Sequence, residues 1–153
     1  MSRAQELLRR IQKCLGGYQV ARPGSAMPRS RDLGGGCHRL FCGNPREQSP
    51  GGNGFVFRNT GYALAFELFA EERDEGFCYR SFSIHLMNVG EGTLMFHKSP
   101  EAARWPEHPE AHIQFDAPEQ TVRSAPFLDW RIPLGEIDPV KCVEYAAALG
   151  AGP

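Results

Sequence analysis

The sequence predicts an α+β fold, with a helix at each end of the chain and a mainly antiparallel sheet of about five to six strands between them. Apolar residues recur at helical spacing near the N-terminus. The middle of the chain alternates apolar and polar residues in short segments separated by turn residues. An Asp-Pro pair then opens a second helical segment. The 153 residues fit one domain, so we expect residues 1–153 to fold as a single α+β domain.

The first predicted element is an amphipathic helix over residues 3–15. Ser2 and Gln5 have the spacing of a capping box, and Gly16-Gly17 supplies a stop. Between them the apolar residues recur at helical spacing: Leu7, Leu8, Ile11, Cys14 and Leu15. The other face is basic: Arg3, Arg9, Arg10 and Lys13.

Residues 22–53 are predicted to form a long loop, because they contain seven glycines, four prolines and five arginines. The segment 38–42 is the one part of this region expected to be ordered. A flexible segment rich in arginine could follow a phosphate backbone, which makes these residues candidate nucleic-acid contacts: Arg22, Arg29, Arg31 and Arg39. The alternative interpretation is a solvated linker, since the acidic segment 71–76 balances the charge and the net charge is −1.

The predicted strands are 54–58, 61–70, 77–87, 93–97 and 111–115. Alternation in the third of these places Cys78, Arg80, Phe82, Ile84 and Leu86 on one face, with Tyr79 and His85 on the other. The same rule turns Leu94, Phe96, Ile113 and Phe115 inward and leaves His97 and His112 on the opposite side. A last helix is expected from Asp138-Pro139 to Gly150.

Three histidines are the best candidates for chemistry. If the strands are neighbours, His85, His97 and His112 converge on one exposed face of the sheet. Imidazole is suited to proton transfer near neutral pH, and it is also a common metal ligand. Arg131 could stabilise developing negative charge; Arg80 could do the same, although alternation places it on the apolar side. The alternative is a set of surface histidines on a polar face.

The cysteines do not predict a metal site or a disulfide framework. Cys37, His38 and Cys42 offer zinc-binding atoms, but their spacing is wider than that of a zinc knuckle and no second cysteine pair follows. Phosphate-binding loops and nucleophile elbows are also missing, so we expect no metal and no cofactor. The five cysteines and the lack of a signal-peptide pattern predict a cytoplasmic protein with reduced thiols. No apolar run approaches the about 18 residues of a membrane helix.

One stretch resembles a known family. Residues 96–116 place Phe96-His97 at a strand end, Ser99-Pro100 in the following loop, and His108 with His112 near the next strand. This pattern resembles small bacterial proteins of toxin–antitoxin and mobile loci, the TumE-type toxins among them. The resemblance implies a small intracellular effector that acts on RNA and is neutralised by an antitoxin-like partner.

Two main hypotheses follow. The first is a toxin or phage-defence-type effector that cleaves phosphodiester bonds, with His112 as acid or base, His85 or His97 as its complement and an arginine as charge stabiliser. The alternative is a non-catalytic binding module or accessory subunit of a larger protein or nucleoprotein complex, because no complete catalytic signature is present and the 22–53 segment could order on a partner. A structural domain whose role lies in an interface also fits the composition.

Overall fold

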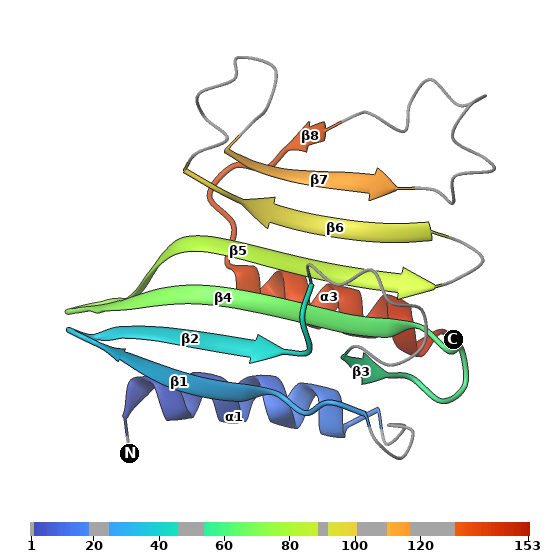
Figure 1. The fold of residues 1–153 in the computed structure, drawn as a ribbon, viewed down its shortest axis with the longest axis horizontal. Helices are drawn as coiled ribbons and strands as arrows, with labels where there is room; N and C mark the ends of the chain where they lie inside the picture. The colour runs from blue at the N-terminus through green and yellow to red at the C-terminus, as the bar shows by residue number, and fades with distance from the viewer. Residues whose placement is uncertain (1, 19–24, 46–53, 89–91, 101–109, 117–130) are drawn as a thin grey trace.

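The computed structural model describes residues 2–18, 25–45, 54–88, 92–100, 110–116 and 131–153, which form an α+β fold (Figure 1). Helices α1 (Arg3–Gly16) and α3 (Pro139–Ala151) flank an open antiparallel sheet, as the sequence predicts. The described residues form eight strands rather than the five to six that were expected. The strands are β1 (Arg29–Gly34), β2 (Cys37–Cys42), β3 (Phe55–Val56), β4 (Ala63–Arg73), β5 (Gly76–Asn88), β6 (Gly92–Lys98), β7 (Ala111–Asp116) and β8 (Arg131–Pro133).

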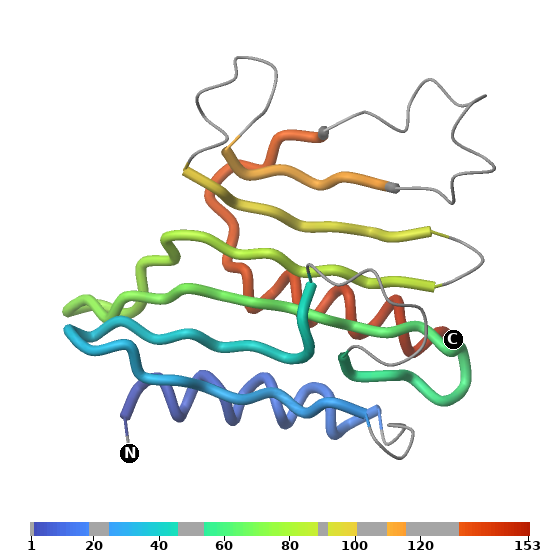
Figure 2. Tube along the Cα trace, in the orientation of Figure 1, coloured from blue at the N-terminus to red at the C-terminus, as the bar shows by residue number. Residues whose placement is uncertain are grey.

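The sheet is a meander with one irregularity. Its order is β1-β2-β4-β5-β6-β7-β8, and every pair is antiparallel. Strand β3 pairs with the start of β4, beyond the end of β2, so β2 and β3 share one edge of β4. The path of the chain through these strands is followed in Figure 2. Consecutive strands therefore lie side by side, which is the arrangement the histidine prediction requires.

Both helices pack on one face of the sheet, the rear face in Figure 1. Ile11 and Leu15 of α1 and Val143 of α3 are fully buried there. They meet the inward rows of the central strands: Leu40, Leu64, Phe66, Leu68, Phe82, Ile84, Leu86 and Phe96. The capping box of Ser2 and Gln5 is formed, and Asp138 caps α3 by accepting a hydrogen bond from the Val140 N–H. No helix in the described part of the chain is long and apolar enough to cross a membrane.

The predicted loop at 22–53 is wrong for most of the residues that can be described. Residues 29–34 and 37–42 form the hairpin β1–β2, in which the expected ordered segment 38–42 is strand β2. Gly34, Gly35 and Gly36 all have positive φ, which allows the tight reversal between the strands. Strand β1 shows no apolar alternation because all its residues are exposed. Residues 22–24 and 46–53 lie outside the described part of the chain.

A β-bulge at Arg80 corrects the predicted faces of β5. Phe69 pairs with Ser81, whereas Ala70 pairs with Tyr79, so Arg80 is the extra residue. A bulge reverses the alternation on one side of it. Tyr79 therefore packs toward the core and Cys78 is exposed, the reverse of the expectation, while Phe82 onward keeps its predicted face. The acidic segment 71–76 belongs mostly to the strands, since β4 continues to Arg73 and β5 begins at Gly76.

Candidate functional site

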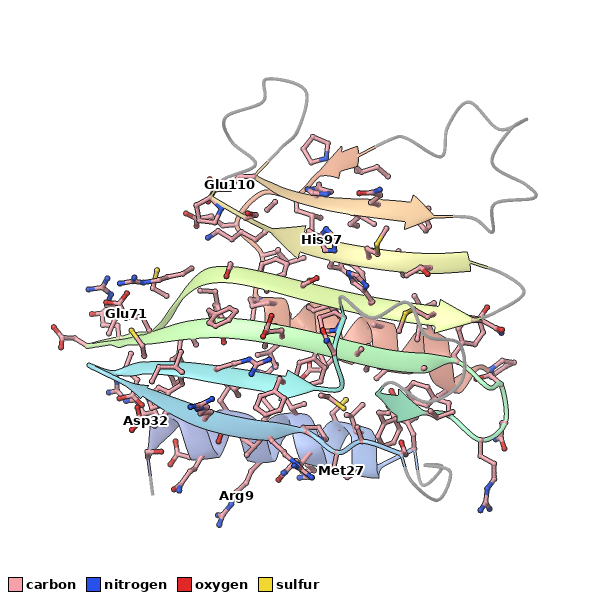
Figure 3. All side chains as sticks on the ribbon, in the orientation of Figure 1. Arg9, Met27, Asp32, Glu71, His97 and Glu110 are labelled. Carbon is pink, nitrogen blue, oxygen red and sulfur yellow. The ribbon has the colours of Figure 1, made fainter. Side chains whose placement is uncertain are left out.

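One row of cross-strand partners runs across the front face of the sheet, opposite the helices. Successive register pairs join Arg29, Phe41, Glu67, Ser83, His97, His112 and Pro133. His85 lies in the next row on β5, opposite Met95 of β6. Figure 3 labels His97 on β6, between β5 and β7. The three histidines therefore share one face, as strand alternation predicts.

The three imidazoles form a continuous chain of rings. The Nε2 atoms of His85 and His97 are 2.6 Å apart, and their ring centroids are 4.9 Å apart. His97 also meets His112 edge-on, with 5.5 Å between the centroids and 81° between the planes. A nitrogen–nitrogen contact of this length requires that one Nε2 donates and the other accepts. The Oγ of Ser83 lies 3.1 Å from the same His85 nitrogen.

These histidines are buried rather than exposed, which corrects the predicted polar surface. His85 is 7% exposed and His112 1%, whereas His97 is intermediate. Met95 and Ala65, the cross-strand neighbours of His85, are buried as well. After β2 the chain passes in front of β4 (Figure 2), and Pro45 lines the same cavity as the histidines. Pro45 therefore covers part of the front face beside the histidines.

Burial sets the protonation state of His85. Desolvation lowers its pKa from 6.5 to about 4, because an imidazolium ion loses its hydration in this position. His85 is therefore neutral at pH 7. Its Nδ1 is buried and has no hydrogen-bond partner in the part of the chain that the structure describes. A pKa this low makes His85 a weaker base than a free imidazole, so its neutral ring is suited to hydrogen bonding with a neighbouring imidazole.

A cavity of about 340 Å³ opens over the three histidines. His85, His97 and His112 line it together with polar groups and two aromatic rings; the other lining residues are Pro45, Glu67, Phe69, Ser81, Phe82, Ser83, Lys98 and Ser99. The volume lies at the small end of the range for ligand sites. We call this space the histidine cavity.

The geometry of the imidazole pair does not suit a shared metal ion. Two nitrogen ligands of a tetrahedral zinc ion are about 3.3 Å apart, given bonds of about 2.0–2.1 Å. The 2.6 Å contact between His85 and His97 is shorter. Within the described ranges no group of three histidine, cysteine or acidic residues is placed to hold a metal ion. Cys37 and Cys42 lie five residues apart on one strand and so point to opposite faces, and all five cysteines are free thiols.

Three of the predicted arginines lie on the front face, between the sheet edge and the cavity. Arg29 and Arg31 are exposed on the edge strand β1, and the register aligns them with Phe41 and Arg39 of β2. The guanidinium of Arg39 lies 4.5 Å from the ring centroid of Phe41, and its Nε donates to Glu67 Oε1 at 2.5 Å. We call Arg29, Arg31 and Arg39 the arginine edge.

The other predicted site residues do not join this group. Arg80 pairs with Glu71 near the turn between β4 and β5, so the structure gives it no part in the cavity. Arg131 lies on β8, and its backbone pairs with that of Gln114 on β7. Arg22 and His108 lie outside the described residues.

Sequence reasoning missed the residues that complete the site. Glu67, Phe69, Ser81 and Ser83 line the histidine cavity. Their signal was present, since strand alternation gives Ser81 and Ser83 the same face as His85. Pro45 had no such signal, because it lies beyond the end of a strand.

Comparison of the chain with family models, with curated proteins and with solved structures gives no match. The chemistry of the site therefore follows from its own residues.

Proposed function

We propose that the protein is a small toxin or phage-defence-type effector that cleaves phosphodiester bonds in RNA with the histidine cluster. One observation carries the proposal: two imidazoles, one of them held neutral by burial, meet nitrogen to nitrogen at 2.6 Å in a cavity that also holds a third. A hydrogen-bonded imidazole pair can accept a proton at one step and return it at the next.

The reaction balances without water or an external acid. A neutral imidazole removes the proton of the ribose 2′-hydroxyl, and the 2′-oxygen forms a bond to phosphorus. The bond from phosphorus to the 5′-oxygen breaks, and that oxygen receives the proton from the imidazolium. The products are a 2′,3′-cyclic phosphate and a 5′-hydroxyl end. Because the 2′-hydroxyl is the nucleophile, DNA is not a substrate.

Exposure separates the roles of the histidines. His97 is the most accessible of the three, and so it is the ring that meets the substrate. His85 and His112 flank it, almost fully buried, and they position its ring on both sides. His112 thus moves from the predicted acid or base to a positioning residue. His85 stays neutral and holds the His97 ring through the Nε2 hydrogen bond.

The arginine edge provides positive charge for the RNA backbone on the approach to the cavity. Arg39 borders the cavity through its hydrogen bond to Glu67, which lines it. Arg29 and Arg31 extend the charge outward along the same face. Cationic side chains that neutralise phosphates supply the sequence-independent part of nucleic-acid affinity.

Two further considerations agree with a toxin. His97 and His112 both belong to the 96–116 stretch that resembles TumE-type toxins, and this resemblance brings with it an antitoxin-like partner. The five free thiols suit a reducing compartment such as the cytoplasm, and burial raises the pKa of the Cys42 and Cys142 thiols to about 12, which keeps them unreactive.

The test is cleavage of a 5′-labelled RNA by the purified protein in the presence of EDTA. We expect fragments that end in a 2′,3′-cyclic phosphate, no cleavage of the matching DNA, and a loss of at least 100-fold for His97→Ala. His38→Gln is the matched control, because His38 lies on the core face of β2 beside Glu72, away from the cavity. Growth arrest on expression should follow the same order. An inactive wild type, or a His97→Ala variant as active as wild type, would refute the proposal.

A non-catalytic binding module is the second candidate, and one observation favours it. Phe115 of β7 and Ile132 of β8 are 50% and 47% exposed on the helix side of the sheet. Phe115 was predicted to face inward, and it does lie on that face, but it is not covered by the described residues. Exposed apolar residues of this kind are typical of binding surfaces. If the protein binds a partner without cleaving RNA, and Phe115→Ser weakens that complex, this candidate is the correct one.

A further inference from the structure

We infer that the substrate is single-stranded RNA, which lies across the front faces of β1, β2 and β4 and reaches the histidine cavity over a platform formed by Arg39 and Phe69. This inference rests on the proposed function and adds the substrate's form and path. Phe41 and Phe69 were not among the residues singled out from the sequence, and no part of the catalytic proposal uses them.

Burial of the imidazoles selects an unpaired strand. His85 and His112 lie almost entirely below the surface, and His97 is only partly accessible. A nucleotide within a duplex is paired and stacked, so its ribose and phosphate cannot descend into a cavity of about 340 Å³. A nucleotide of a single strand can be splayed out and inserted, as in most sequence-reading RNA sites.

Two adjacent rows of the sheet form the path. In one row Arg31, Arg39, Phe69 and Ser81 are successive cross-strand partners. In the next row the partners run from Arg29 through Phe41, Glu67 and Ser83 to His97. Strands are spaced by about 4.8 Å, so the second row spans about 19 Å from the sheet edge to the catalytic ring. That distance requires a substrate of several nucleotides.

Aromatic and guanidinium planes lie where bases would stack. Phe69 is partly exposed and lines the cavity, and Arg39 is its cross-strand neighbour. The guanidinium of Arg39 lies over the Phe41 ring, and 32% of the Arg39 side chain is exposed, so a base can reach it. Stacking on aromatic rings and guanidinium planes is the usual means of holding unpaired bases, and it tolerates any sequence.

The outer arginines are placed for phosphates. Arg29 and Arg31 are exposed on the edge strand, and in the described part of the chain neither lies within 4 Å of a carboxylate. Arg39, by contrast, is bonded to Glu67. Two uncompensated cations at the entrance and one compensated cation at the cavity give a charge gradient along the path. A basic groove with stacking rings describes the general single-strand site.

Binding can be measured without cleavage. The probe is a fluorescein-labelled 12-nucleotide RNA whose 2′-hydroxyls are methylated, which removes the nucleophile, and its affinity is followed by fluorescence anisotropy. A hairpin of the same chemistry provides the duplex. We expect the single strand to bind at least tenfold more tightly than the hairpin. Phe69→Ala should raise the Kd roughly 5- to 150-fold. Phe69→Tyr keeps an aromatic ring and should bind with the wild-type Kd.

The charge contribution has its own control. Arg31→Gln should weaken binding and reduce the slope of log K against log salt by about 0.7. Arg9→Gln removes the same charge from the exposed face of α1, on the opposite side of the sheet (Figure 3), and should leave both quantities unchanged. Thermal melting of each variant confirms that it is folded.

Each outcome decides one proposal. Equal affinity for hairpin and single strand, an unchanged Kd for folded Phe69→Ala, or equal effects of Arg31→Gln and Arg9→Gln would overturn the inference while leaving histidine-dependent cleavage intact. Selective single-strand binding in a protein that cleaves no RNA would refute the enzyme and leave the binding path standing.

Discussion

Replacing His85 with leucine should remove a pH dependence from the stability of the fold. Burial lowers the pKa of His85 to about 4, whereas in the unfolded chain it is near 6.5. Above pH 6.5 the imidazole is neutral in both states and does not affect stability. As the pH falls below 6.5, the unfolded chain binds a proton that the folded protein refuses, so the free energy of unfolding decreases. The decrease stops below about pH 4, where both states are protonated.

The size of the effect follows from the two pKa values. The full difference corresponds to about 3 kcal/mol, and about 2 kcal/mol of it is reached at pH 5. The discount for solvent is small because His85 is only 7% exposed. Wild type should therefore lose about 2 kcal/mol relative to His85→Leu between pH 7.5 and pH 5.

Urea unfolding at the two pH values measures this difference. Carboxylates titrate in both proteins and cancel in the comparison. Met95→Leu is the control, because Met95 is the cross-strand partner of His85 and has no proton to exchange. Its stability relative to wild type should be the same at both pH values. An identical gap between wild type and His85→Leu at pH 7.5 and pH 5 would show that His85 is not held neutral.

The remaining predictions concern the fold. Gly150→Ala would place a Cβ 2.6 Å from the ring of Phe57, and should cost about 1–3 kcal/mol by thermal denaturation, whereas Gly135→Ala, with open space around it, should cost far less. Asp138→Ala removes the N-cap of α3 and should lower stability by about 1 kcal/mol, measured by circular dichroism. Leu15→Ala, at a fully buried position of α1, should cost about 2–5 kcal/mol in urea unfolding; a value below 1 kcal/mol would contradict the packing of α1 on the sheet.

The sequence predicted most of the elements because their patterns are local. The capping box and spaced leucines define α1, and the Asp-Pro pair defines the start of α3. Strands β5 and β6 alternate because one face packs into the core. Strand β1 was not predicted, and the reason is physical. It lies at the edge of the sheet with every residue exposed, so it has no buried side to create a period of two.

The sequence predicted which face of the sheet carries the three histidines, but it did not predict that they are buried. Alternation and hairpin order were sufficient to bring His85, His97 and His112 onto one face. Their burial depends on which segment covers that face, and such a contact is long-range. The pairing of Arg39 with Glu67 is also tertiary, since it depends on the register between β2 and β4. Local sequence patterns predict neither the burial of the histidines nor the pairing of Arg39 with Glu67.

The buried histidines lower the stability of the fold. A buried imidazole nitrogen without a hydrogen bond destabilises the folded state, and an apolar residue would fill the position of His85 better. Local violations of this kind are expected at functional sites. His85→Leu should therefore separate the two properties in one variant: stability at pH 5 rises relative to wild type, whereas RNA cleavage falls because His97 loses its hydrogen-bonded partner. A variant that gains stability and keeps full cleavage would place the chemistry elsewhere in the molecule.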